Sequence, residues 1–359
     1  MALLSAGALL GLAVPTASAA PLFTGAVLGH AYSVENDHTA VTMLSDGSAI
    51  VAGSYESVGG ATAAAPDLTG TGSLPTVPGG GTRYGFIAKR TAAGAFTWQT
   101  AITTTGGDFV TLLDVAALPD GSAIVVGAFR GTASFGAITT DPVADSGGHL
   151  FAAKIKADGS GFAWVLTPTA DSDQSRAAGV HVLADGSAVI TGDFYVSITL
   201  GGTTLTAAGD SDLLVAKVAP DGSSVEWAIG GGGAGREWAN GGSATDAGSA
   251  VIAGYCNGRA TFGASTIDCT AHDTPLIVKA RSDGSGWQWA MVPTVSGDGS
   301  ANDVAALPDG TVVAVGSVRG TATFGSTELS GVPGTDHAFV VRAKSDGSGY
   351  TWVRQIDSG

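Results

Sequence analysis

Side chains that can contact a polar ligand recur at one position in five similar segments of the sequence. They lie two residues before five short apolar runs and are Tyr84, His149, Asp212, Thr274 and His337. A loop position occupied in turn by Tyr, His and Asp can supply a ligand site where copies converge, although solvated loop residues are the simpler interpretation. Tyr84, His149, Asp212 and His337 are therefore the candidate ligand-binding residues.

No catalytic residue is assigned. The sequence contains no GxSxG, HExxH or phosphate-loop motif, and the glycine run at Gly230 lacks the Lys-Ser/Thr ending of a phosphate cradle. The 31 acidic residues offer too many carboxylate pairs to single one out. The sequence thus favours a non-catalytic protein and leaves enzyme activity open.

Two acidic pairs, Asp171-x-Asp173 and Asp210-x-Asp212, suggest calcium but lack the rest of a calcium loop. Calcium is therefore the one cofactor left open, and turn or cap roles explain both pairs.

The only two cysteines, Cys256 and Cys269, predict a local disulfide in an oxidising compartment. A metal site with Asp268 and His272 is the less favoured alternative for this segment.

One Trp follows the second Asp-Gly or Ala-Gly turn of each segment, at intervals of 62 to 66 residues: Trp98, Trp164, Trp227, Trp289 and Trp352. Such regularity indicates a repeat. We expect these indoles to fill gaps between repeats, and an aromatic platform for sugar rings is the alternative. A basic residue also recurs inside each third strand (Lys89, Lys154, Lys217, Lys279 and Arg342), for which repeated ion pairs are favoured over a cationic ligand site.

Each repeat predicts four strands. An apolar patch leads through an Asp-Gly turn, or TDAGS at Thr245 in the fourth repeat, into a second strand ending at Gly53, Gly127, Gly192, Gly254 or Gly316. These second strands are apolar at consecutive positions, so both of their faces must be covered, as in stacked antiparallel sheets. Even spacing of four such strands is typical of a β-propeller blade. We predict five blades at about 38–105, 108–170, 171–233, 236–296 and 297–359, with a surface loop between Tyr55 and Tyr84.

Five motifs follow one another in a fixed order: DGS, an apolar strand ending in Gly, GTATFG, FVAK and DG-x-x-x-W. In this order they resemble the bacterial secreted beta-propeller repeat, SBBP, from about Val41 to Ile356. The resemblance implies four-stranded blades in a secreted or cell-surface protein, and it carries no catalytic residues. A strand-like segment at 21–28 and a complete last repeat together leave open a truncated ring of six to eight blades.

The formal net charge of −15 argues against nucleic acid and anionic lipid as partners. Residues 1–19 resemble a secretory signal without its basic start, which predicts export and a mature chain from Ala20 with no membrane span. We expect a secreted β-propeller, residues 20–359, acting as a scaffold or binding module for protein or carbohydrate. The alternatives are an extracellular hydrolase or lyase with a site at the channel mouth, and a Trp-based lectin.

Overall fold

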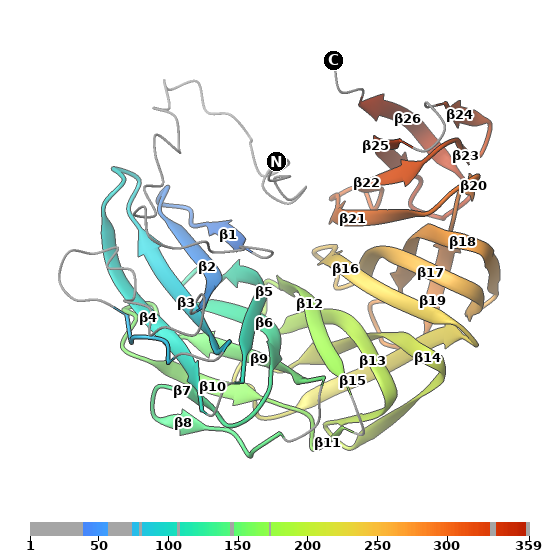
Figure 1. Ribbon diagram of the computed structural model, residues 1–359. Helices are drawn as coiled ribbons and strands as arrows, with labels where there is room; N and C mark the ends of the chain where they lie inside the picture. Colours follow the sequence, from blue (N-terminus) through green and yellow to red (C-terminus); the bar gives the residue numbers. More distant parts are fainter. Residues whose placement is uncertain are drawn as a thin grey trace. The chain divides into compact units, whose positions relative to one another are not determined.

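The computed structural model describes residues 39–56, 74–78, 81–105, 108–143, 147–171, 174–330 and 335–356. All regular elements in these ranges are β-strands, which confirms the prediction of an all-β fold (Figure 1). In this described portion, no helix is long and apolar enough to cross a membrane. The predicted signal segment 1–19 and the strand-like segment 21–28 lie outside the described residues. The chain divides into an N-terminal part up to Thr167 and a C-terminal part from Pro168.

The N-terminal part contains two four-stranded antiparallel modules in which each strand pairs with its neighbour. Module 1 consists of β1 (Thr39–Met43), β2 (Ala49–Glu56), β3 (Arg83–Arg90) and β4 (Phe96–Thr104). Module 2 consists of β5 (Val110–Ala117), β6 (Ala123–Phe129), β9 (His149–Ile155) and β10 (Phe162–Leu166). A short hairpin, β7 (Ala133–Phe135) and β8 (Ile138–Thr139), lies between its second and third strands.

The C-terminal part repeats this plan three times. Module 3 consists of β12 (Ser175–Val182), β13 (Ala188–Leu200), β14 (Thr203–Val218) and β15 (Val225–Gly233). Module 4 consists of β16 (Arg236–Ala244), β17 (Ala250–Phe262), β18 (Ser265–Ala280) and β19 (Trp287–Met291). Module 5 consists of β21 (Gly299–Ala306), β22 (Val312–Arg319), β25 (Asp336–Ala343) and β26 (Tyr350–Ile356), with the hairpin β23 (Ala322–Phe324) and β24 (Thr327–Leu329) inserted.

Within each part the hydrophobic core lies between consecutive modules. Every residue of β6 is buried, and its side chains share one core with β2 and β3 of module 1. A second core joins modules 3 and 4, and a third joins modules 4 and 5. The second strands are therefore apolar at consecutive positions because each face packs against a neighbouring layer.

The glycine that ends the apolar run of the second strand is required by a close approach of the first strand. The first strand carries a bulge opposite it in modules 2 to 5. A Cβ on this glycine would lie 1.8–2.1 Å from a carbonyl oxygen of that strand, at Gly127, Gly192, Gly254 and Gly316. Any larger residue would have to displace the bulge.

The segment that reads GTATFG in module 5 extends pairing from one module to the next. In module 2 it forms β7, which pairs with the end of β4 through Thr103 and Ser134. In module 4 the end of β17 pairs with β15 through Gly232 and Thr261. In module 5, β23 pairs with β20 (Thr294–Val295), which follows β19 of module 4. In module 3 the end of β13 pairs, within the C-terminal part, with β11 (Ala170–Asp171).

Three last-strand tryptophans, Trp98, Trp227 and Trp289, contact the second turn of the following module. Nε1 of Trp98 donates to the carbonyl of Ala157 at 3.1 Å, and Nε1 of Trp289 donates to Ser345 at 3.0 Å. A Cβ on the turn glycine would lie 2.5 Å from the ring in three cases: Gly159 on Trp98, Gly284 on Trp227 and Gly347 on Trp289. These three indoles therefore act in contacts between modules.

Replacing one of these turn glycines should destabilise the fold more than its backbone conformation alone explains. Gly159 and Gly136 have φ of +71° and +64°, but a Cβ at Gly136 meets nothing within 4 Å. We expect Gly136→Ala to cost about 1 kcal/mol for the left-handed backbone. Gly159→Ala should cost about 2–4 kcal/mol because the methyl group also displaces Trp98. Urea unfolding of both variants measures the difference, and equal losses would contradict the packing role of Trp98.

Candidate functional site

A cluster of arginine and aromatic side chains lies where module 3 meets module 4. We define the Arg-aromatic cluster as Tyr195 on β13, Arg236 and Trp238 on β16, and Tyr255 on β17. Nη1 of the exposed Arg236 donates to the Tyr255 hydroxyl at 3.4 Å, and the rings of Trp238 and Tyr255 stack with centroids 6.5 Å apart. Burial raises the pKa of the Tyr195 phenol, while the nearby Arg236 charge opposes this shift. Part of the cluster is accessible to a ligand.

An ion pair between the half-buried Arg176 and the buried Asp193 contacts Trp238 through the guanidinium. Nε of Arg176 on β12 lies 3.0 Å from Oδ1 of Asp193, and its guanidinium lies 3.6 Å from the centre of the Trp238 ring. The same Asp193 oxygen accepts from the N–H of Ala239 at 3.1 Å. Desolvation raises the pKa of the fully buried Asp193, although the Arg176 charge opposes it.

The link from Asp193 to the next module has a neutral counterpart in the N-terminal part. Ser54 stands at the equivalent position of β2 and accepts from the N–H of Leu112 on β5 at 3.2 Å. Module 3 thus uses a carboxylate where module 1 uses a hydroxyl. The carboxylate also binds Arg176 and so positions that arginine against the Trp238 ring.

Two carboxyl groups, Asp212 on β14 and Glu237 on β16, lie side by side next to Arg236 of the Arg-aromatic cluster. Parallel pairing of Ser211 with Arg236 brings the residues that follow them into register. Asp212 is 4% exposed and Glu237 is fully buried. Desolvation raises the pKa of Asp212 to about 6 and that of Glu237 to about 7, and the charge of Asp212 adds to the second shift. Two carboxyl groups with raised pKa values can hold a proton near neutral pH.

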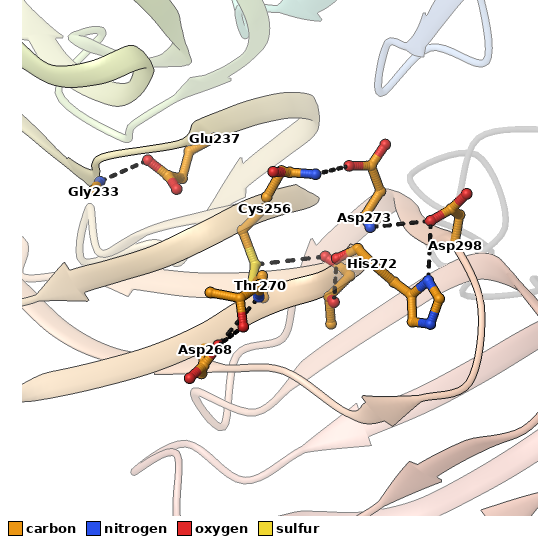
Figure 2. Close-up of a disulfide and its surroundings, with 11 residues drawn as sticks. Gly233, Glu237, Cys256, Asp268, Thr270, His272, Asp273 and Asp298 are labelled. Atoms are coloured by element: carbon orange, nitrogen blue, oxygen red, sulfur yellow. Dashed lines mark hydrogen bonds and ion pairs between the residues drawn. A yellow bond between two sulfur atoms is a disulfide. The ribbon is translucent and has the colours of Figure 1, made fainter.

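In the described part of the chain, backbone N–H groups donate to the carboxylate oxygens of this pair. Gly233 donates to Oε2 of Glu237 at 2.8 Å (Figure 2), and Ala208 donates to Oδ1 of Asp212 at 3.2 Å. Oε1 of Glu237 is buried without a hydrogen-bond partner among the described residues.

The predicted disulfide between Cys256 and Cys269 is confirmed, and it closes the β17–β18 hairpin. Asp268 accepts from Thr270 and pairs with Arg259 at 3.2 Å, whereas His272 lies 3.5 Å from Asp298 (Figure 2). Asp298 also accepts from the N–H of Asp273, whose side chain binds Asn257. The histidine and acids near the disulfide are thus engaged in hairpin contacts and in links to module 5.

The four candidate ligand-binding residues occupy one register position in four modules, but they have different surroundings. Tyr84 is buried against Tyr55, Leu74 and Val77, so the described end of the expected surface loop forms a small core. His149 pairs with Phe129 across the sheet. His337 contacts Thr335 at 3.0 Å in module 5, and Asp212 lies in the carboxyl pair of module 3. Of the four, Asp212 alone adjoins the Arg-aromatic cluster; ligand contact by all four stays a prediction.

The repeated basic residues bind the turns. Lys217 pairs with Glu226 at 3.0 Å and with Asp185 of the first turn at 3.8 Å. Arg342 pairs with Asp309 at 2.6 Å, and Nζ of the buried Lys279 donates to the Gly310 carbonyl at 3.0 Å. Lys217 and Arg342 thus form ion pairs as expected from the sequence, whereas Lys279 binds a backbone carbonyl group.

Sequence reasoning missed Glu237, Arg236, Trp238, Tyr255 and Asp193. All five differ from the residues that other modules carry at the same positions. This difference from the repeat is the signal in the sequence that could have identified them. Among the described residues, no group of three or more His, Cys, Asp or Glu side chains gathers around a possible metal position. The Asp171-x-Asp173 pair falls outside the described side chains.

No protein-family model matches the chain, and no curated protein is significantly similar to it.

Reduction of the disulfide should destabilise the C-terminal part. The bridge spans 13 residues between two buried cysteines, and closing such a loop contributes about 3 kcal/mol in the chain-entropy picture. We expect a reductant to lower the free energy of unfolding by about 2–3 kcal/mol. The matched control is the Cys256→Ala/Cys269→Ala variant, whose unfolding the reductant should not change. Identical midpoints for oxidised and reduced wild type would contradict the prediction.

The carboxyl pair should make the protein less stable as pH rises through neutrality. The folded pKa values of about 6 and about 7 lie above the ordinary values of 3.8 and 4.5, so folding favours the protonated forms. The stability that these protons contribute is complete below pH 4 and is lost as pH rises through 6 and 7.

Glu237→Gln mimics the protonated side chain, so the variant should be more stable than wild type at pH 8 by about 2 kcal/mol and similar at pH 5. Chemical denaturation at both pH values in metal-free buffer measures this effect. The exposed Glu328→Gln variant serves as the control and should follow wild type. A wild-type stability that increases from pH 5 to 8, with Glu237→Gln showing the same slope, would contradict the raised pKa values.

Proposed function

We propose that this chain is an extracellular β-propeller of the bacterial secreted beta-propeller repeat type, acting as a non-catalytic binding module for a protein or carbohydrate. The five modules support this architecture, because a propeller covers both faces of every blade with a neighbouring blade. Five blades are the simplest ring, and a ring of six to eight remains the alternative. The disulfide supports an oxidising compartment, as does the predicted export segment.

The observation that carries the binding function is that repeated side chains and non-repeated side chains have different uses. Those that recur, namely the turn aspartates, second-strand glycines, last-strand tryptophans and third-strand basic residues, are used in turns and contacts between modules. The Arg-aromatic cluster breaks the repeat, and Arg236 at its surface is exposed. Tyr, Trp and Arg are the residues most enriched at binding hot spots, because they combine a large contact area with polar groups.

Hydrolysis or elimination by an enzyme is a second candidate, favoured by the raised pKa values of Asp212 and Glu237. A general acid needs such a shift, but both carboxyl groups are buried. The lectin alternative requires open indole faces. It is less favoured because Trp164 and Trp289 are 9% and 4% exposed and Trp98 packs on Gly159.

Glycan-array and cell-surface binding by the purified chain tests the proposal. We expect saturable binding that weakens at least tenfold in Arg236→Ala and Tyr255→Ala, a loss of about 1.4 kcal/mol or more. Arg259→Ala is the matched control, because Arg259 is an exposed arginine of the same module outside the cluster. Binding unaffected by the cluster variants would overturn the assigned surface. Multiple-turnover release of products from a bound glycan would instead favour the enzyme.

A further inference from the structure

The structure places two buried carboxyl groups together, and the described residues provide no positive partner for them. The parallel register of β14 and β16 puts Asp212 beside Glu237. A Cβ on Gly232 would lie 2.2 Å from Oε2 of Glu237 and 2.6 Å from Oδ1 of Asp212, so both groups border one point. The neighbouring arginines have other contacts: Arg176 pairs with Asp193, and Arg236 donates to Tyr255.

Burial of two carboxylates is unfavourable unless protons or cations neutralise them. Glu237 is fully buried, and its Oε1 has no hydrogen-bond partner among the described residues although the other oxygen binds Gly233. An unsatisfied charged oxygen beside a second carboxyl group is a ligand position for a hard cation.

We propose that Asp212 and Glu237 form a site for a hard divalent cation, with Ca²⁺ the preferred ion in an extracellular protein. Two carboxylates are enough to anchor Ca²⁺, because backbone carbonyl groups and water commonly complete its six to eight oxygen ligands. The absence of a side chain on Gly232 lets the backbone of β15 pass close to both carboxyl groups, where a Cβ would meet Oε2 of Glu237 and Oδ1 of Asp212. The site would join β14 and β15 of module 3 to β16 of module 4, so a bound ion would strengthen the contact between these modules.

This proposal is independent of the binding function and is tested on the purified chain after removal of metals. CaCl₂ and MgCl₂ are titrated separately at constant ionic strength, and calorimetry and thermal unfolding are recorded. We expect one saturable site for at least one of the two ions, with an increase in Tm as it fills. Glu237→Gln and Asp212→Asn should weaken the affinity at least tenfold, and both variants keep the size of the side chain.

Asp273→Asn is the control, because Asp273 is a carboxylate of module 4 outside the pair, and it should leave the affinity unchanged. Circular dichroism without added metal establishes that each variant is folded. Absence of saturable binding by either ion to wild type would overturn the proposal. Equal binding by wild type, Glu237→Gln and Asp212→Asn would also overturn it, because the ion would then occupy another site.

Discussion

The arrangement of this repeat depends on the contact between a last-strand indole and the turn glycine of the next module. The ring lies so close to the glycine Cα that no side chain fits between them, and its N–H binds a carbonyl group of the same turn in two of the three cases seen. One interaction thus sets both the distance and the register between consecutive sheets. The apolar second strands can then be buried on both faces, and the Asp-Gly turns keep their conformation at the sheet ends.

The candidate site lies where this regular plan is broken. Module 4 starts its first strand with Arg236, Glu237 and Trp238, where module 2 has Phe109, Val110 and Thr111. Module 3 places Asp193 where other modules have Ser, Ala or Tyr. Glu237 and Asp193 bury charge, so neither of these two changes favours folding by itself. Local departures that cost stability are expected at functional positions. The cost here falls on the junction between modules 3 and 4, whereas the junction between modules 1 and 2 has a neutral link at the equivalent position, from Leu112 to Ser54.

Much of the fold could be predicted because its determinants are local and repeated. Asp-Gly turns, glycine-terminated strands and the spacing of Trp98 to Trp352 gave the strand order of all five modules, and two cysteines 13 residues apart gave the disulfide. The carboxyl pair could not be predicted in this way. Asp212 meets Glu237 through parallel pairing between two modules, and nothing within either segment determines that register. Asp212 was identified by its position in the repeat, whereas Glu237 fits no repeated motif.

A double-mutant cycle between Trp98 and Gly159 tests the central claim most directly. If the indole and the turn glycine set the spacing of modules, Trp98→Ala removes the obstacle that a methyl group at position 159 meets. The account predicts that Gly159→Ala costs far less in the Trp98→Ala background than in wild type, with a coupling energy of about 1–3 kcal/mol. Additive losses from the two substitutions would show that the contact does not hold the modules together, and would contradict the account.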